Sequence, residues 1–191
     1  MMSRIAKAGA GIAAMLALAG CATAPVLDAA AGRKPFVPEQ FFRGPTYAQG
    51  EFVNVIDGSK RGVRAIINGR FDGRALILVE DFAYSDGERD RKTWVLTKTG
   101  PTTYSGTRED VIGAAQGRLD GGLFRLTYQA SVKTKTSAYD LTFDDVLGYE
   151  PDGSVLNRAV VSKLGVKIGE ITLRISRRPA TAFLQPPAPR R

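Results

Sequence analysis

Hydrophobic and polar residues alternate with a period of two through most of the chain after residue 35. The clearest stretch is 123–133, where Phe124 and Leu126 fall on one face and Arg125 on the other. Such alternation predicts strands with one buried face, and no stretch after residue 35 keeps apolar residues at helical spacing for three turns. Asp-Gly and Asn-Gly pairs separate the stretches and are typical of tight turns.

This pattern predicts nine or ten strands with short connections, and therefore antiparallel neighbours. A meander of this length buries its apolar faces by curling into a closed barrel, and a barrel of about eight to ten strands is wide enough to hold a small ligand. A two-sheet sandwich is the alternative, and a short helical turn at 38–43 is expected to plug one end of the barrel. We expect strands at 48–56, 62–70, 74–84, 89–98, 102–107, 113–119, 123–133, 136–147, 154–163 and 166–176.

The start of the chain has a different pattern. A positively charged beginning is followed by an uncharged apolar run over residues 8–20, which is too short to span a bilayer comfortably and is typical of a signal peptide. The run ends in Leu-Ala-Gly-Cys, which resembles the bacterial lipobox, where the cysteine thiol is linked to diacylglycerol after cleavage. We therefore expect a lipoprotein signal peptide at 1–20 and lipidation of Cys21; an ordinary secretory signal is the alternative.

The residues after the cysteine predict the location and the domain limits. In lipoproteins of Gram-negative bacteria an Asp after the cysteine commonly marks inner-membrane retention, so Ala22 favours the outer membrane, with the protein facing the periplasm. Residues 21–37 then form the lipid anchor and a flexible tether, and 38–176 form the barrel domain. The Pro-rich basic tail, 177–191, is expected to be disordered, and it would be attracted to anionic lipid head groups.

Composition narrows the chemistry of this single domain of 191 residues. The chain has no His and one Cys, which excludes Ser-His-Asp and Cys-His catalytic machinery, internal disulfides and cysteine-based zinc sites. The net charge of +8 belongs mainly to the ends, because residues 36–176 contain 19 basic and 18 acidic side chains. Together with the export signal, this distribution argues against nucleic-acid binding.

Charged and polar residues interrupt several of the predicted strands. Glu80 and Asp81 follow an apolar run on neighbouring positions, so one of the two carboxylates is expected to point inward. Asp145 and Asn157 are in phase with apolar neighbours and are expected to face the same interior. The candidate network for a ligand or for internal polar contacts is Glu80, Asp81, Tyr84, Arg91, Trp94, Asp144, Asp145, Asn157, Arg158 and Lys163.

This candidate network has three interpretations. Buried carboxylates need partners, so the first is an internal salt-bridge network completed by Lys163, Arg91 or Arg158. The second is an anchor for the head group of an amphipathic ligand. The third is catalysis by an acid pair such as Asp81 and Asp145. No metal site or cofactor is expected.

Short segments that occur in unbroken order across residues 40–176 resemble those of a known protein family. They are Phe41-Phe42-Arg43-Gly44, Gly50-Glu51-Phe52, Phe71-Asp72-Gly73, the run from Glu80 to Glu88, Trp94, Tyr104-Ser105-Gly106, Asp110-Val111-Ile112-Gly113, Ala115-Gln116-Gly117, Phe143-Asp144-Asp145, Leu156-Asn157-Arg158, Ser162-Lys163-Leu164-Gly165 and Gly169-Glu170. As a set they resemble a family of bacterial lipoproteins catalogued as domain of unknown function 3833. The resemblance implies a lipocalin-like, calycin-type β-barrel on a lipid anchor, with no established activity.

The resemblance also bears on the ligand. Genes of the family that this sequence resembles often lie beside genes for cyclopropane-fatty-acid-synthase-like enzymes. The resemblance therefore implies a link to membrane fatty-acid modification and a fatty-acid or phospholipid ligand. We expect a membrane-anchored binding or carrier protein in which Lys163 or Arg158 holds the head group. The alternatives are a non-catalytic scaffold with a solid core, docking an envelope protein partner, and a weak lipid-modifying enzyme that uses acidic residues.

Overall fold

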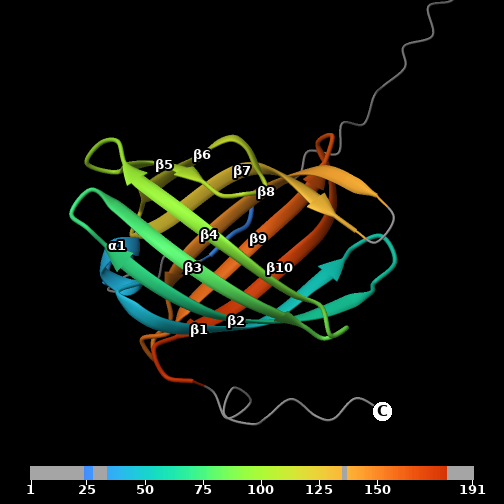
Figure 1. The fold of residues 1–191 in the computed structure, drawn as a ribbon, viewed down its shortest axis with the longest axis horizontal. Coiled ribbons are helices and arrows are strands. Elements are labelled where there is room, and N and C mark those ends of the chain that lie inside the picture. Colours follow the sequence, from blue (N-terminus) through green and yellow to red (C-terminus); the bar gives the residue numbers. More distant parts are fainter. Residues whose placement is uncertain (1–23, 28–33, 135–136, 180–191) are drawn as a thin grey trace, which may run out of the picture.

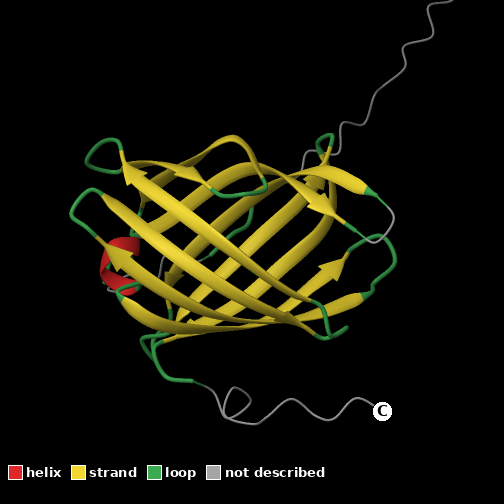
Figure 2. Ribbon diagram, in the orientation of Figure 1, coloured by secondary structure: helices red, strands yellow, loops and turns green. Residues whose placement is uncertain are grey.

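In the computed structural model, ten antiparallel strands form one closed barrel with a short helix at one end (Figures 1 and 2). The structure describes residues 24–27, 34–134 and 137–179. Its elements are α1 (Pro38–Phe41), β1 (Gly44–Asn54), β2 (Lys60–Phe71), β3 (Ala75–Tyr84), β4 (Arg89–Lys98), β5 (Thr103–Thr107), β6 (Val111–Asp120), β7 (Leu123–Lys133), β8 (Ala138–Tyr149), β9 (Val155–Lys163) and β10 (Val166–Ser176).

The strands follow one another around the barrel in chain order, and β1 pairs with β10 to close the ring. The predicted meander barrel is therefore confirmed and the sandwich alternative is wrong. The largest difference in strand limits is at β1, which begins at Gly44 rather than at residue 48 and ends at Asn54. The helical turn expected at 38–43 is present as α1 and ends at Phe41.

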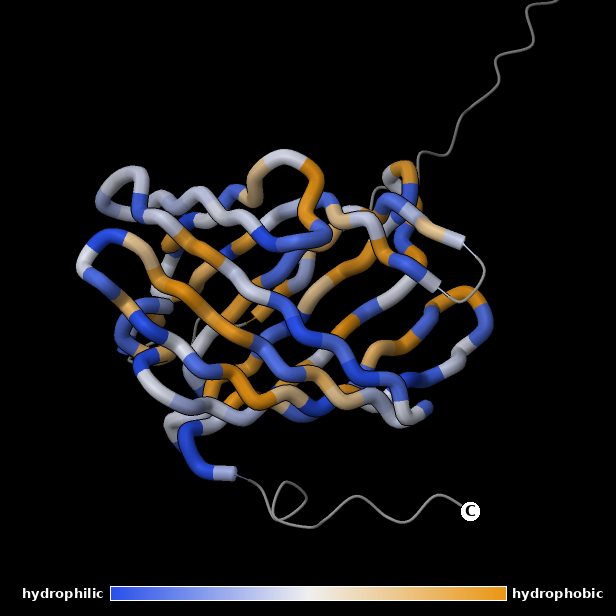
Figure 3. The backbone as a smooth tube through the Cα atoms, viewed as in Figure 1, coloured by the Kyte–Doolittle hydropathy of each residue, from blue (hydrophilic) through white to orange (hydrophobic). Residues whose placement is uncertain are grey.

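Side-chain alternation sets the direction of each residue along the strands. In β7, Phe124 and Leu126 are buried inside the barrel while Thr127 is exposed on the outer face. Figure 3 shows hydrophobic and hydrophilic segments interleaved along most strands. Successive residues of a strand point to opposite faces, so one sequence pattern supplies both the apolar interior and the polar exterior.

One end of the barrel is closed by the segment that precedes β1. Phe36, Phe41 and Phe42 pack edge to face or tilted against one another, with ring centroids 5.0 to 6.1 Å apart. Two of these rings, Phe36 and Phe41, also contact Tyr149 at the end of β8. Within the barrel, the rest of the buried apolar cluster extends from this closed end.

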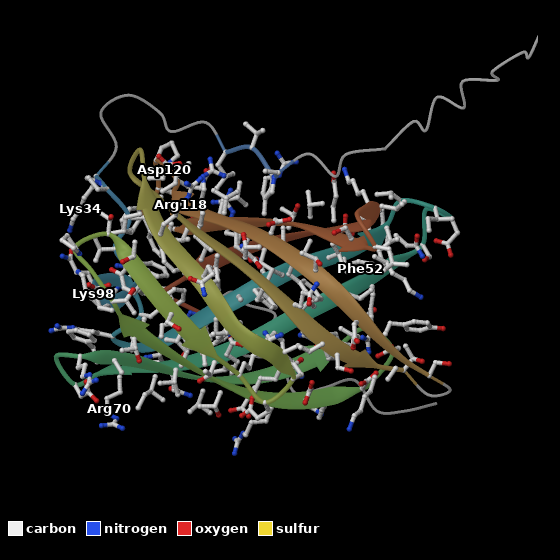
Figure 4. The ribbon with its side chains drawn as sticks, turned by 90° about the horizontal axis from the view of Figure 1, so that it is seen from above. Lys34, Phe52, Arg70, Lys98, Arg118 and Asp120 are labelled. Carbon is white, nitrogen blue, oxygen red and sulfur yellow. The ribbon has the colours of Figure 1, made fainter. Side chains whose placement is uncertain are left out.

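Polar contacts fix α1 in the closed end. The Glu39 carboxylate accepts a hydrogen bond of 2.9 Å from the Tyr104 hydroxyl and one of 3.2 Å from the Lys98 ammonium. Close approach of the backbone also matters here, because a Cβ on Gly69 would lie 1.6 Å from the carbonyl oxygen of Phe42. Figure 4 labels Lys98 at this end of the barrel and Phe52 toward the opposite, open end.

Residues 24–27 lie outside the barrel, against the wall formed by β7, β8 and β9. The carbonyl oxygen of Pro25 accepts a hydrogen bond of 3.5 Å from Arg125, and that of Val26 accepts one of 3.5 Å from Arg158. Cys21, the predicted signal peptide and residues 180–191 of the predicted tail lie outside the described residues. Across the described ranges, the helices are too short to span a bilayer.

Candidate functional site

A cavity of about 940 Å³ lies inside the barrel between the closed end and the open end. Most of its wall is apolar and comes from nearly every strand. Its aliphatic and aromatic lining includes Phe52, Val63, Ile67, Leu78, Phe82, Phe124, Leu126, Leu141, Phe143, Leu147, Val161, Ile171 and Leu173. A cavity of this volume and chemistry is large enough for a drug-sized or single-chain lipid ligand.

A polar belt crosses the cavity at the middle of the strands. It consists of Glu80 on β3, Tyr128 on β7, Asp145 on β8, Asn157 on β9 and Arg108 from the β5–β6 connection. These five residues are far apart in sequence, and the fold brings them close enough to act on one another: Arg108 acts on Glu80, Asp145 and Tyr128, and Asn157 binds Asp145. We call this group the polar belt.

The two carboxyl groups of the belt differ in their partners. Asp145 accepts a hydrogen bond of 2.8 Å from the Asn157 amide. Glu80 is 9% exposed, and no described residue donates a hydrogen bond to its carboxyl group. None of the fully buried side-chain oxygens or nitrogens among the described residues lacks a partner, so the Glu80 carboxyl faces the cavity and is open to a donor there.

Arg108 is held by an acid and by two aromatic rings. Its guanidinium donates to both carboxylate oxygens of Asp110, at 2.6 and 3.3 Å. The guanidinium carbon also lies 4.6 Å from the ring centroid of Trp94 and 5.1 Å from that of Tyr128. Lys92 forms ion pairs with the same Asp110 at 2.8 Å and with Asp90 at 3.0 Å. Arg108 in the belt and Lys92 beside it are therefore already paired with acidic side chains.

Burial dominates the protonation of the belt. It raises the pKa of Glu80 to about 7, although Arg108 and Lys92 act in the opposite direction. It also raises the pKa of Asp145 to about 6, partly offset by the hydrogen bond from Asn157 and by Arg108. Burial likewise raises the pKa of the Tyr128 hydroxyl far above its ordinary value. At pH 6 the belt therefore retains protons that exposed carboxylates would have lost.

Some of the residues expected from sequence do face the cavity. Glu80, Tyr84, Trp94, Asp145 and Asn157 all line it, on four different strands. Of the Glu80-Asp81 pair, the inward carboxyl is that of Glu80, whereas Asp81 lies on the outer face in an ion pair with Arg91 at 2.5 Å. The expected acid pair of Asp81 and Asp145 is wrong, because the wall of the barrel separates the two.

The expected basic partners of the buried carboxylates are also wrong. Arg91 is occupied by Asp81, and Arg158 lies on the exposed outer face, where it contacts Val26. Lys163 has the phase of an inward residue, but it stands at the exposed open rim with its ammonium 4.3 Å from the ring centroid of Tyr139.

Asp144, the remaining member of the expected network, is directed away from the cavity. Its carboxylate accepts a hydrogen bond of 2.8 Å from the Thr127 hydroxyl on the neighbouring strand. In the part of the chain that the structure describes, no cluster of three or more Asp, Glu or Cys side chains has the arrangement of a metal site.

Two belt residues, Arg108 and Tyr128, were not among the residues predicted from the sequence; Tyr128 lies in phase with Phe124 and Leu126, whereas Arg108 lies outside the strands. Arg108 is the first residue of the sequence Arg-Glu-Asp, which forms the short connection between β5 and β6. Outside the strands, the alternation of residues does not indicate where a side chain points. A signal was present, since this connection contains three charged residues and no glycine. A turn of that composition is held by side-chain contacts, and here Asp110 provides them.

Comparisons with known proteins address the fold and the family. The family described as "Protein of unknown function (DUF3833)" matches residues 15–177, as the short sequence segments predicted. No curated protein matches the chain. Among solved structures, the barrel is similar to the S-type phycobiliprotein lyase CPES from Guillardia theta, with a TM-score of 0.53 and 10% identity over 72% of this chain and 89% of that chain. At this identity the likeness concerns the fold, which is lipocalin-like as predicted.

Proposed function

The chain belongs to the DUF3833 family, whose description names no function, and we propose that it is a carrier that binds a lipid-like amphipathic molecule inside its barrel. The observation that carries this proposal is the apolar cavity of about 940 Å³ with a polar belt at its middle. Ligand pockets are commonly about 300–1,000 Å³, mainly apolar, with a few convergent polar groups.

The cavity argues against a scaffold with a solid core. A barrel that served only as a rigid support would be stabilised by filling its interior, because empty apolar volume is destabilising. Here the closed end is tightly packed, while partly exposed rings such as Phe82 and Phe143 surround the cavity at the open end. The space is therefore better explained by a molecule that occupies it.

The place of action in this proposal is the cell envelope. The signal-like segment and the lipobox-like residues support an acyl anchor on Cys21, with the carrier facing the periplasm from the outer membrane. Two or more acyl chains would hold it there, since each buried methylene contributes about 0.8 kcal/mol. A carrier fixed at a membrane surface is suited to amphipathic components of that membrane.

Native mass spectrometry tests the carrier. The chain from residue 22 to 191, exported to the periplasm behind a cleavable signal, contains every described element. We expect a stoichiometric adduct of one lipid class, identified after solvent extraction. A clean apo mass that takes up no amphiphile when several are offered would contradict the proposal.

The anchor is tested separately on the full chain. Cells fed a labelled palmitate analogue should incorporate the label into the wild-type protein and not into Cys21→Ala. Label in both proteins, or in neither, would remove the lipid anchor from the proposal while leaving the cavity and its ligand intact.

A further inference from the structure

We infer that the polar belt selects an amphiphile whose polar group donates hydrogen bonds, an amine above all and a hydroxyl second, and that it rejects a carboxylate. This inference rests on the proposed function and specifies the ligand class for the same cavity. It differs from the fatty-acid ligand that the family resemblance implies, because the bases expected to hold a fatty-acid head group, Lys163 and Arg158, lie outside the belt.

The belt offers acceptors for a ligand. Glu80 is more than nine-tenths buried, lines the cavity and receives no hydrogen bond from the described residues. Asp145 is better satisfied, because it receives a hydrogen bond of 2.8 Å from Asn157 and the Tyr128 hydroxyl acts on it as a second donor. A ligand donor that reaches Glu80 would satisfy the carboxyl group that the protein leaves without one.

The belt offers little to an anion. Arg108 already binds both oxygens of Asp110, and Lys92 binds Asp110 and Asp90. Arg61, nearer the mouth, is paired with Asp86 and Glu88. A ligand carboxylate would therefore need to displace an existing partner and would meet the charge of Glu80 and Asp145 as well.

The remaining bases that line the cavity lie at its outer limit. Arg89 begins β4 and Lys133 ends β7, both exposed at the open end, and Arg91 is paired with Asp81 on the outer face. Aromatic side chains at the belt favour a cation further, because the Tyr128 ring, stacked on Phe143 with centroids 4.9 Å apart, borders the same space.

The protonation state of Glu80 predicts how ligand binding changes with pH. Burial raises the pKa of Glu80 most, Arg108 and Lys92 lower it, and Asp145 and Asp110 raise it, which together leave it at about 7. Above that pH Glu80 is ionised and attracts an ammonium group. Amine binding should therefore strengthen between pH 5.5 and 8, whereas carboxylate binding should weaken over the same interval.

The test compares three amphiphiles with the same twelve-carbon chain: dodecylamine, dodecanol and laurate. The protein is the chain from residue 22 to 191, and the signal is the fluorescence of Trp94, the single tryptophan of the sequence, whose ring lines the cavity. At pH 7.5 we expect dodecylamine to bind at least tenfold more tightly than laurate, with dodecanol between them. Titration calorimetry checks the stoichiometry of one.

Two variants assign the selectivity to the belt. Glu80→Gln should lower the affinity for dodecylamine about tenfold and change the affinity for dodecanol by no more than about twofold. It should also remove most of the pH dependence of dodecylamine binding. Asp81→Asn is the matched control, because it removes a carboxylate from the adjacent outward position and should change none of the three affinities. Asp145→Asn serves as a second belt variant if Glu80→Gln does not fold.

The outcomes separate the inference from the function. Laurate binding as tightly as dodecylamine, or Asp81→Asn having the same effect as Glu80→Gln, would overturn the ligand class while the carrier stands. Failure of all three amphiphiles to alter Trp94 fluorescence, combined with an apo mass in native mass spectrometry, would overturn the carrier itself.

Discussion

The closed half and the open half of the barrel share one alternating pattern but differ in how their interiors are filled. In the closed half, Phe41 and Leu76 are each 1% exposed and belong to a continuous apolar cluster. In the open half, Phe82 and Phe143 also point inward, yet they remain partly exposed around the cavity. The difference arises because the segment from Phe36 to Phe42 fills only one end. Alternation sets the direction of side chains, and a segment outside the strands decides whether the space between them is filled.

The largest expected effect is the loss of a ring from the closed half. Phe41→Ala should lower the free energy of unfolding by about 3–5 kcal/mol, since Phe41 packs against three other rings. Phe82→Ala, in the open half, should cost about 1–2 kcal/mol because that ring already borders empty space. Urea denaturation of both variants measures the difference. Equal losses would show that the two halves are equally packed.

The second expected effect is a dependence of stability on pH that originates at the polar belt. The folded-state pKa values of Glu80 and Asp145, about 7 and about 6, lie above their ordinary values of 4.5 and 3.8. The folded protein therefore binds more protons than the unfolded chain between about pH 4 and 7, and stability falls as pH rises through this window. The Glu80 contribution is on the order of 3 kcal/mol.

Denaturation at pH 5 and pH 8 checks this effect. The chain contains no His, so no other side chain has an ordinary pKa between these values and the change reports on the belt. Glu80→Gln should remove most of the difference. A wild-type stability that rises from pH 5 to pH 8 would show that the belt is not desolvated.

A third, smaller effect compares the two ends of β2. Gly69→Ala should destabilise the protein by about 1–3 kcal/mol, because its Cβ would meet the backbone of Phe42 at 1.6 Å. Gly62→Ala, near the open end of the same strand, meets only the Ser85 side chain at 3.3 Å and should be close to neutral. The melting temperature of each variant measures this difference. A larger loss of stability in Gly62→Ala than in Gly69→Ala would contradict the close packing of Phe42 against β2.

The smallest expected effect is that of Lys163→Ala at the open rim. Its ammonium interacts with the exposed ring of Tyr139, a contact worth about 0.5–1 kcal/mol at most. Stability should change by no more than that, and the affinity for dodecylamine should not change. A loss of ligand affinity in this variant would place the head group at the rim rather than at the belt.

The fold could be predicted from the sequence because its cause is local. Alternation, as in β7, indicates where a strand lies and which of its faces is buried, and the glycine-containing turns indicate where it ends. Because the connections are short, consecutive strands must pair antiparallel. Closure of the ring then follows from the need to bury ten half-apolar strands. The register of β1, which begins four residues early, depends on contact with Gly69 on β2 and has no local signal.

The site could be predicted only in part. Phase along a strand correctly indicates an inward residue at Asp145 and Asn157, because each has apolar neighbours two positions away. Glu80 and Asp81 both have such neighbours, so phase predicted one inward carboxylate without indicating which of the two it is. Phase does not give height along the barrel axis, so it placed Lys163 at the belt when it stands at the rim. Phase is undefined in connections, which is why Arg108 was missed.

The pairing of β1 with β10 has a consequence for how the chain is made. Tyr47 lies opposite Ser176 in this pair, so the ring closes between residues that are synthesised almost at the beginning and at the end of the barrel. Until β10 emerges, β1 and β9 each present a free hydrogen-bonding edge, and such edges associate readily with other chains. The barrel can therefore close only after β10 has been made, in a slow long-range step. A chain cut short before residue 166 would keep both edges open, and we expect it to aggregate rather than to form a smaller barrel.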